Sequence, residues 1–276
     1  MKLKTQLIML VAVLFTVSCD KNDEPDVNHA QDIAGKYEGY SVSEFQYTAI
    51  PITTPSENIS ITANENGTGT LSFESVTWGK FTIPTAEVTL TGNEYKIAGS
   101  GKTVMGMDPA SQKEYDCTIT GTISKDKKTV SILFEVPAVM GGLKITFTQG
   151  EAPASMVVAG VYNGTLELSV GSTNMDPVEN SKVTIKHQEN GKAEVTLEGF
   201  GEGGMAFQDI VIEDVEVTAK TDGSYSLTGN IDTMSGTTNV TGKLEGAIAK
   251  EGDANITFTL KPGAMPMNII AVFTGE

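Results

Sequence analysis

The sequence predicts an all-β protein made of two tandem antiparallel up-and-down β-barrels of eight strands each. Three observations predict this fold class: an internal duplication, an apolar–polar alternation with a period of two, and a regular supply of tight-turn sequences. The duplication shows first in the motif A-G-x-Y-x-G, which occurs at residues 34–39 and returns at residues 159–164. Further matches run through both copies and end with Gly-Glu at residues 150–151 and 275–276. We therefore expect two domains with one fold.

Apolar and polar residues alternate over many short segments. The second copy shows this at residues 183–187, 195–198 and 215–218, and the first copy at residues 71–74 and 88–91. A period of two is typical of strands with one buried face and one wet face, as in antiparallel sheets. No segment has a convincing amphipathic helical pattern.

Turn sequences separate these segments. Asn-Gly follows Glu at residues 65–67 and 189–191, and Asp222 precedes Gly223. Such pairs accept the positive φ that tight hairpin turns require. Eight strands of about 8–10 residues fill one repeat and are enough to close a barrel, which removes the exposed sheet edges. A two-sheet sandwich would use the same strands and remains the alternative.

Strand positions follow from the same pattern. In the second copy we expect strands near residues 160–170, 181–188, 191–198, 207–220, 224–229, 237–248, 254–261 and 267–274. The first copy gives a matching set, except that Pro84 is expected to interrupt the strand near residues 81–87.

Composition excludes one class of partner. The chain of 276 residues has 35 acidic and 19 basic residues, a formal charge of −16, and every basic residue is lysine. Binding to phosphate backbones relies on clustered cations, arginine above all, so a nucleic-acid partner is not expected.

The N-terminus has the features of an export signal. Lys2 and Lys4 precede a short apolar run that ends in small residues directly before Cys19. This junction resembles a bacterial lipobox, which implies lipidation of Cys19 and anchoring to a membrane through the acyl chains. The alternative is an ordinary signal peptide with Cys19 incidental. The acidic, Pro-bearing run that follows is predicted to be a tether.

Several motifs together resemble one family. They are the Gly-x-Tyr-x-Gly opening, the Glu-Asn-Gly hairpin, the run at residues 210–217 and the segment at residues 222–229. These resemble the calycin-like β-barrel lipoproteins of Bacteroidetes, over all of the second copy and most of the first. The resemblance implies a lipocalin-like barrel, an outer-membrane lipoprotein that can be exposed on the cell surface, and a molecular function that is not established. Because the second copy keeps the pattern more closely, functional residues are expected there first.

The predicted organisation follows from the repeat and the leader. It comprises a signal peptide at residues 1–18, an acidic tether from lipidated Cys19 at residues 19–31, a first barrel at residues 32–150, a linker at residues 151–157 and a second barrel at residues 158–276.

No recognisable catalytic set is present. Cys117 falls on a buried face and matches Gly242 in the second copy, so it is predicted to fill the core. His187 at a strand end and His29 in the tether do not form a zinc site. The sequence also lacks a calcium loop, a phosphate-binding loop, a Gly-x-Ser-x-Gly elbow and a paired serine–histidine arrangement. We expect no enzyme, no cofactor and no metal site, and a hydrolase with paired carboxylates ranks last.

Methionine and aromatic residues give the one hypothesis for a site. Methionine is adaptable and recurs on surfaces that bind apolar partners. A small apolar or amphipathic ligand at a barrel mouth is therefore the first hypothesis, and packing of the same side chains as core is the alternative. A protein that docks an envelope component or a host molecule is the second hypothesis. The residues proposed to line a mouth are Trp78, Phe81, Met105, Met107, Met140, Phe200, Met205, Phe207, Met234, Met265 and Met267.

Overall fold

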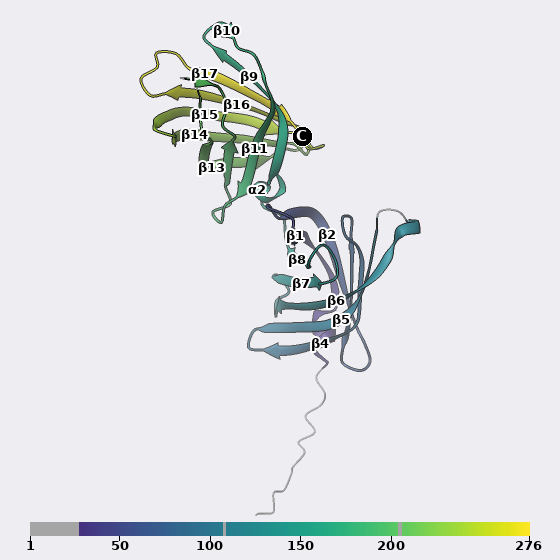
Figure 1. Cartoon of the computed structure of the whole chain (residues 1–276). Helices are drawn as coiled ribbons and strands as arrows, with labels where there is room; N and C mark the ends of the chain where they lie inside the picture. Colours follow the sequence, from purple (N-terminus) through teal and green to yellow (C-terminus); the bar gives the residue numbers. More distant parts are fainter. Residues whose placement is uncertain (1–27, 107–108, 204–205) are drawn as a thin grey trace, which may run out of the picture.

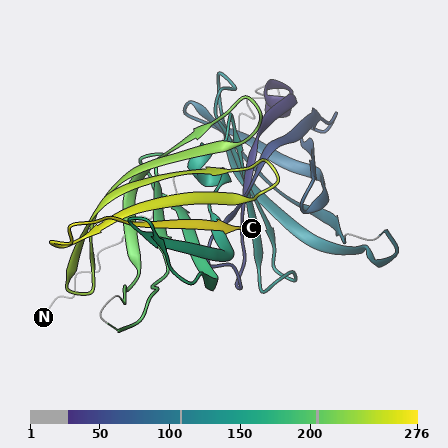
Figure 2. The same cartoon turned by 90° about the horizontal axis from the view of Figure 1, so that it is seen from above.

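The computed structural model describes residues 28–106, 109–203 and 206–276, which form two β-barrels joined by a short linker (Figure 1). The leader and Cys19 lie outside the described residues. Seen from above, the purple-to-teal strands of the first barrel separate from the green-to-yellow strands of the second (Figure 2).

The first barrel is a closed eight-stranded meander. Its last strand pairs with its first, from Gly39 opposite Gln149 to Glu44 opposite Lys144. A one-turn 3-10 helix, η1 (Pro109–Ser111), lies between its fifth and sixth strands. The strands are β1 (Gly35–Glu44), β2 (Ile52–Ala63), β3 (Gly69–Ser75), β4 (Gly79–Thr91), β5 (Glu94–Met105), β6 (Lys113–Ser124), β7 (Val130–Val136) and β8 (Leu143–Gln149).

The second barrel closes in the same way. Its first and last long strands pair from Gly164 opposite Gly275 to Val170 opposite Ile269. A two-residue strand, β10 (Thr173–Asn174), pairs with the end of the first long strand of this barrel. The long strands are β9 (Gly160–Val170), β11 (Val178–His187), β12 (Ala193–Leu197), β13 (Ile210–Ala219), β14 (Tyr225–Ser235), β15 (Thr238–Ile248), β16 (Ala254–Pro262) and β17 (Ile269–Gly275). Both units are barrels, so the sandwich alternative is excluded.

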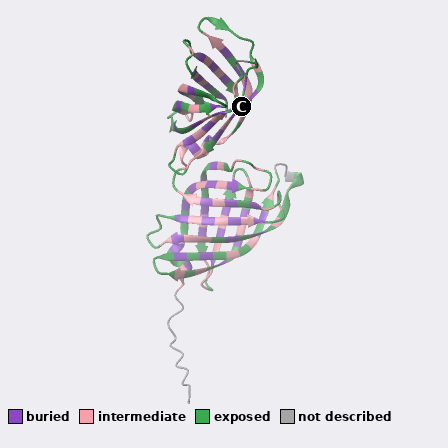
Figure 3. Cartoon of the chain, turned by 60° about the vertical axis from the view of Figure 1, so that its left-hand side comes forward, coloured by how far each residue is buried: buried purple, intermediate pink, exposed green. Residues whose placement is uncertain are grey.

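Burial follows the predicted alternation, with buried and exposed residues banded along each strand (Figure 3). The core of the first barrel centres on Phe73, whose ring centroid lies 5.4 Å from that of Phe81, 4.9 Å from that of Phe134 and 6.3 Å from that of Phe147. The second core is mostly aliphatic, with Phe258 and Phe273 fully buried.

Two short helices were not expected, and each lies across one end of a barrel. Helix α1 (His29–Ile33) is capped by the Asn28 side chain and buries Ala30 and Ile33. His29, which the sequence analysis assigns to the tether, therefore lies in α1, because this helix carries apolar residues that pack on the barrel. Helix α2 (Ala154–Val157) occupies the predicted linker and closes the second barrel.

The repeated A-G-x-Y-x-G motif joins each helix to its barrel. The Tyr37 hydroxyl donates a hydrogen bond to the Ile33 carbonyl over 2.6 Å, and the Tyr162 hydroxyl donates to the Val158 carbonyl over 2.9 Å. The last glycine of the motif sits at the closing seam. A Cβ on Gly39 would overlap the Thr148 carbonyl oxygen, and one on Gly164 would overlap that of Thr274.

Pro84 does not interrupt its strand. Strand β4 continues through it, and the pairing with β5 shifts register between Thr82 and Thr85. A bulge accommodates proline because the residue without an N–H then falls where the ladder is already broken. The Pro84 carbonyl accepts hydrogen bonds from Asn64 and Thr70.

A second bulge occurs at equivalent places in both barrels. Ser56 and Asn180 have positive φ values of 60° and 56°, and the pairing shifts register beside each. Directly after these residues, Glu57 pairs with Gly39 and Ser181 pairs with Gly164. Because both glycines end the repeated motif, Glu57 and Ser181 occupy the same position in the two barrels.

Candidate functional site

Each barrel has a short helix packed at one of its two ends. We call the end that holds the helix the base. The opposite end is called the mouth. The strands that run toward the mouth are β1, β3, β5 and β7 in the first barrel and β9, β12, β14 and β16 in the second. Among the described residues, none of the helices has the length and apolar character needed to cross a bilayer.

The structure divides the predicted site residues between the two mouths. In the first barrel, Trp78 and Met105 are partly buried and pack against the core. The Trp78 ring lies edge-on to Phe45, with centroids 5.9 Å apart. Phe81 is fully buried within the phenylalanine core, and Met140 is exposed in the turn before β8.

The second mouth gathers the other group. Phe200 and Phe207 stack with centroids 5.0 Å apart, and their backbones exchange hydrogen bonds of 3.1 and 2.7 Å. Met234 and Met267 are exposed, and Met265 is partly buried. Met107 and Met205 lie outside the described residues.

A polar cluster that the sequence analysis missed lies inside the first barrel, toward its mouth. Its centre is Glu57, only 2 % exposed. The Ser75 hydroxyl donates to Glu57 Oε1 over 2.7 Å, and the Ser41 hydroxyl donates to the same oxygen over 3.4 Å. We define the mouth cluster as Ser41, Ser43, Thr54, Glu57, Ser75, Trp78 and Thr103.

Three polar atoms of the mouth cluster have no hydrogen-bond partner among the described residues. They are Ser43 Oγ, Thr103 Oγ1 and Trp78 Nε1, and each is shielded from solvent. Ser43 and Thr103 are completely buried residues at inward positions near the mouth ends of β1 and β5. Leaving a buried polar group unpaired costs about 1–3 kcal/mol, so such groups are uncommon without a role.

Glu57 also lacks a balancing cation. None of the ion pairs formed by the described residues includes it. Burial raises the pKa of the Glu57 carboxyl, and the hydrogen bonds from the Ser75 and Ser41 hydroxyls and from the Val76 backbone N–H oppose that rise. A carboxyl in this setting favours a positively charged or hydrogen-bond-donating partner.

The fold itself does not require this polarity. By the strand register, Ser41 and Ser43 correspond to the buried Leu166 and Leu168 of the second barrel, and Glu57 corresponds to Ser181. The second barrel therefore builds the same position from apolar side chains and one hydroxyl. Its sequence match to the family made it the expected place for function, yet the buried carboxyl is in the first barrel.

Exposed apolar side chains surround both mouths. At the first mouth, Tyr47 is 76 % exposed and Val76 is 84 % exposed, and Met140 lies on the same rim. At the second mouth the exposed side chains are those of Met175, Met234 and Met267. The first mouth thus combines an apolar rim with a polar interior.

A serine–histidine pair is present, although the sequence shows no such motif. Ser155 Oγ lies 2.7 Å from His187 Nδ1 and donates to the Gly191 carbonyl over 2.8 Å. Because the Ser155 hydroxyl proton is donated to the Gly191 carbonyl, His187 Nδ1 must carry a proton and donate it to Ser155 Oγ. His187 therefore cannot act as the base that removes the hydroxyl proton of Ser155. Ser155 is also completely buried, and burial lowers the pKa of His187. The pair therefore fixes α2 to the base of the second barrel.

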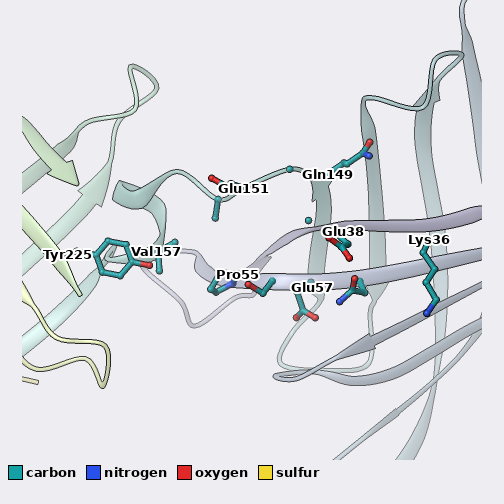
Figure 4. A pocket seen from close by; sticks show the side chains of 13 residues that line it. Lys36, Glu38, Pro55, Glu57, Gln149, Glu151, Val157 and Tyr225 are labelled. Carbon is teal, nitrogen blue, oxygen red and sulfur yellow. The ribbon is translucent and has the colours of Figure 1, made fainter. Parts of the chain in front are cut away.

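The two barrels enclose a cleft of about 920 Å³ at their junction. It lies between β1, β2, the linker and Tyr225 of the second barrel (Figure 4). Lys36, Glu38 and Glu151 give it a mixed charge. Figure 4 shows the Glu57 carboxylate turned away from the linker, consistent with its hydrogen bonds to Ser41 and Ser75 inside the barrel.

The remaining sequence candidates fill structural roles. Cys117 is buried and unpaired, and burial raises the pKa of its thiol to about 11. Gly242 occupies the equivalent position in the second barrel. Cys117 belongs to the hydrophobic core of the first barrel, which confirms its predicted core role. Within the described residues, no group of three or more His, Cys, Asp or Glu side chains is placed to hold a metal ion.

Closed eight-stranded meanders with a short helix across the base define a class of small up-and-down β-barrels. The calycin-like β-barrel domain matches residues 33–150 and again residues 158–276. The chain therefore belongs to the calycin-like β-barrel family and carries two copies of its domain, as the sequence motifs predicted.

One solved structure agrees with this assignment. A Bacteroides fragilis protein described as a candidate outer membrane protein is 35 % identical to the chain, with a TM-score of 0.78 over 90 % of this chain and 99 % of that one. A Nostoc punctiforme protein of unknown function is 10 % identical over 90 % of this chain and 98 % of that one, with a TM-score of only 0.20. No curated protein matches the chain.

Proposed function

We propose that this protein is a non-catalytic binding module of the bacterial cell envelope that holds a small amphipathic ligand at the mouth of its first barrel. In this proposal Cys19 carries the lipid anchor, and the protein is an outer-membrane lipoprotein. The leader, the residues before Cys19 and the similarity to a candidate outer membrane protein of B. fragilis support that location.

One observation carries the binding proposal. The mouth cluster holds two completely buried hydroxyls, Ser43 and Thr103, that have no partner among the described residues. Because these atoms and the Trp78 N–H are shielded from solvent, a ligand with polar groups would pair with them once the side chains that cover the mouth move apart. The apolar rim formed by Tyr47, Val76 and Met140 would contact the rest of such a ligand.

Packing sets the depth of the site. Phe73 contacts the rings of Phe81, Phe134 and Phe147 and fills the middle of the barrel. Side chains commonly fill eight-stranded barrels in this way. A ligand is therefore held at the mouth and does not extend through the barrel, and its size is correspondingly small.

The same site supports binding better than hydrolysis. Glu57 is the one buried carboxyl of the described residues. A carboxylate pair for glycoside hydrolysis needs a second group about 5–10 Å away in an open cleft. Ser155 and His187 have side chains that can act in catalysis, and they lie at the base of the second barrel. The Ser155 hydroxyl donates its proton to the Gly191 carbonyl, so it is not poised to act as a nucleophile.

Native mass spectrometry of the chain purified from its own host tests the proposal. We expect a reproducible extra mass that disappears on organic extraction. Ser43→Leu, which copies Leu168 of the second barrel, should abolish that mass by filling the mouth cluster. Ser181→Ala in the second barrel is the matched control and should keep it. An identical extra mass in Ser43→Leu would move the site elsewhere.

A clean apo mass would instead favour docking to another envelope component or a host molecule. The exposed rim around Tyr47 and Val76 is the feature that supports this second candidate. Crosslinking from position 47 on intact cells should then give a discrete product, and no product would count against docking.

A further inference from the structure

A second cavity between the barrels, of about 340 Å³, lies beside helix α2, and we call it the α2 cavity. We propose that it binds a small, neutral and mostly apolar molecule with one hydroxyl group, which donates a hydrogen bond to Nε2 of His187. The residues of the mouth cluster do not line this cavity, so the inference goes beyond the function proposed above and does not rest on it. Three features carry it: the apolar space, the fixed tautomer of His187 and the contrast with the first barrel.

The walls of the α2 cavity come from both barrels. One wall is formed by β1, β2 and the loop between them, and the other by α2 and the end of β11. Helix α2 contacts both β2 and β11 and lies where the two barrels meet (Figure 1). Ligand sites occur preferentially at such domain interfaces, with volumes of about 300–1,000 Å³ and mostly apolar linings. The apolar residues that line the cavity are Val42, Ala49, Ile50, Pro51, Met156 and Ala159.

The α2 cavity lies outside the wall of the first barrel. Val42 and Thr53 line it, whereas their neighbours Ser43 and Thr54 are buried. Successive side chains of a strand point to opposite faces, so a ligand can enter the cavity without opening the core of the barrel. An apolar cavity of about 150 Å³ accepts benzene, so the space beside α2 is sufficient for one substituted ring.

His187 supplies a hydrogen-bond acceptor to this cavity. Its Nδ1 donates to the buried Ser155 hydroxyl, and a neutral imidazole has one donor and one acceptor, so Nε2 is the acceptor. Burial lowers the pKa of His187, which keeps the ring neutral at pH 7. Nε2 has no hydrogen-bond partner among the described residues, yet it is not one of their unpaired polar atoms that are shielded from solvent. A ligand can therefore reach it.

The other polar groups do not select a charged ligand. Glu44, Thr53 and Lys186 complete the lining with His187. Lys186 Nζ already lies 3.2 Å from Glu194 Oε1, and the Glu44 side chain is exposed to water. Ion pairs at exposed positions contribute little, and an apolar lining disfavours the transfer of an ion from water. A neutral hydroxyl that donates to Nε2 is the group that fits this lining.

The first barrel provides an internal comparison. Counting back from the repeated A-G-x-Y-x-G motif matches Ser155 to Ala30. Gly35 pairs with Ile61 and Gly160 pairs with Ile185, so two residues further along the strand His187 corresponds to Ala63. The first barrel thus packs its helix on two alanines. A helix at the base does not require a hydroxyl–imidazole contact, and this contact is an added feature of the second barrel.

A ligand-detected NMR titration of the full chain tests the proposal. The probe is para-ethylphenol. Its comparators are para-ethylanisole, which lacks the donor, para-ethylbenzoate, which is an anion, and para-ethylbenzylamine, which is a cation. We expect para-ethylphenol to bind and each comparator to bind about tenfold more weakly, because each loses the hydrogen bond to Nε2 or brings a charge into an apolar cavity.

Two variants and a control locate the bound probe. The double variant Ser155→Ala with His187→Ala copies Ala30 and Ala63 of the first barrel and should weaken binding about tenfold by removing the acceptor. Ala49→Leu adds bulk to the opposite wall and should abolish binding while His187 stays in place. Ser181→Ala, at the mouth of the second barrel, is the control and should keep the affinity.

A second readout covers a double variant that fails to fold, which circular dichroism would show. The chain has only two histidines, so the imidazole nitrogens are readily assigned in nitrogen NMR spectra. In the unsubstituted chain, para-ethylphenol should shift the Nε2 signal of His187 and leave its Nδ1 protonated. Para-ethylanisole should not shift that signal. An Nε2 signal that does not respond to bound para-ethylphenol would overturn the assignment of the acceptor.

The outcomes separate this inference from the proposed function. Tighter binding of the anion or the cation than of para-ethylphenol would overturn the neutral ligand class. Unchanged affinity in Ala49→Leu would place the probe elsewhere and overturn the site, as would the absence of binding by every probe. A clean apo mass in the native mass spectrum would count against the mouth site alone, because the mass lost in Ser43→Leu reports on the mouth and not on the α2 cavity.

Discussion

Glu57 and Ser181 occupy the same position in two barrels of one chain, each directly after a residue of positive φ and each paired with the last glycine of the repeated motif. The two barrels thus present one backbone site with a carboxyl in the first and a hydroxyl in the second. This pairing makes it possible to test the chemistry of the carboxyl separately from the fold around it.

The first prediction concerns the stability of the ligand-free protein. Because burial raises the pKa of Glu57 above its ordinary value of 4.5, the folded state holds this proton more tightly than the unfolded state. The associated destabilisation is absent below pH 4.5 and develops as the pH rises through the folded pKa. Glu57→Gln should therefore gain stability relative to the unsubstituted chain between pH 4.5 and 7, as measured by urea unfolding. A constant difference across this window would contradict the assignment.

The second prediction concerns His187, whose pKa burial lowers from its ordinary value of 6.5. The unfolded state then binds the proton more readily, so stability is present above pH 6.5 and is lost as the pH falls through the folded pKa. His187→Asn removes this titration, and the stability difference between it and the unsubstituted chain should shrink between pH 7 and 5. Urea unfolding at several pH values measures this difference in the free energy of unfolding. A difference that does not change with pH would contradict the role of His187 in holding α2.

The third prediction concerns the hydroxyls that join the helices to the barrels. Tyr37→Phe leaves the Ile33 carbonyl without its 2.6 Å hydrogen bond in a buried setting, at a cost of about 1–3 kcal/mol. Tyr162→Phe removes the equivalent hydrogen bond to the Val158 carbonyl. This bond is less buried than that of Tyr37, so its loss should lower the free energy of unfolding by less. Calorimetric unfolding of both variants measures how much stability each one loses. A larger loss of stability for Tyr162→Phe than for Tyr37→Phe would contradict the prediction.

The fourth prediction concerns the closing seam of the second barrel. A methyl group at Gly164 would overlap the Thr274 carbonyl, so Gly164→Ala should destabilise the protein by about 1–3 kcal/mol or more. Gly160→Ala is the matched control, because its added Cβ would meet only the Tyr162 ring at 3.7 Å. Thermal unfolding of the two variants should show a large loss for the first and little for the second.

The fifth prediction concerns Cys117. With its side chain buried and its thiol pKa raised to about 11, little thiolate exists at pH 8. Iodoacetamide at pH 8 should leave the Cys117 peptide unmodified in the folded protein and modify it fully in urea, as read by peptide mass spectrometry. Rapid labelling of the folded protein would show that this part of the core opens.

Much of the fold could be predicted from the sequence because its determinants are local. The Asn-Gly and Asp-Gly turns and the period-two alternation each act over a few residues, and the repeat doubles the signal. The helices were missed because α1 and α2 span only His29–Ile33 and Ala154–Val157, too short for a helical period to show. Their positions depend on contacts with the barrels.

The mouth cluster was missed for a different reason. Counting back in twos from Ile61 and Ile59 reaches Glu57, and counting forward from Tyr37 reaches Ser41 and Ser43. The inward positions were therefore present in the pattern, but polar residues at such positions normally mark the end of a buried run. The Ser155–His187 contact joins segments that are separated along the chain, so only the fold reveals it.

The pairing of the first and last strands in each barrel also determines where a barrel can be attached. Strand β1 starts and strand β8 finishes at the base, where α1 lies, so the chain enters and leaves the first barrel at the same end. An attachment through the N-terminal segment, as proposed for Cys19, would therefore hold this barrel by its base. The mouth, with Trp78 and Glu57 beneath its rim, lies at the opposite end of the first barrel from α1.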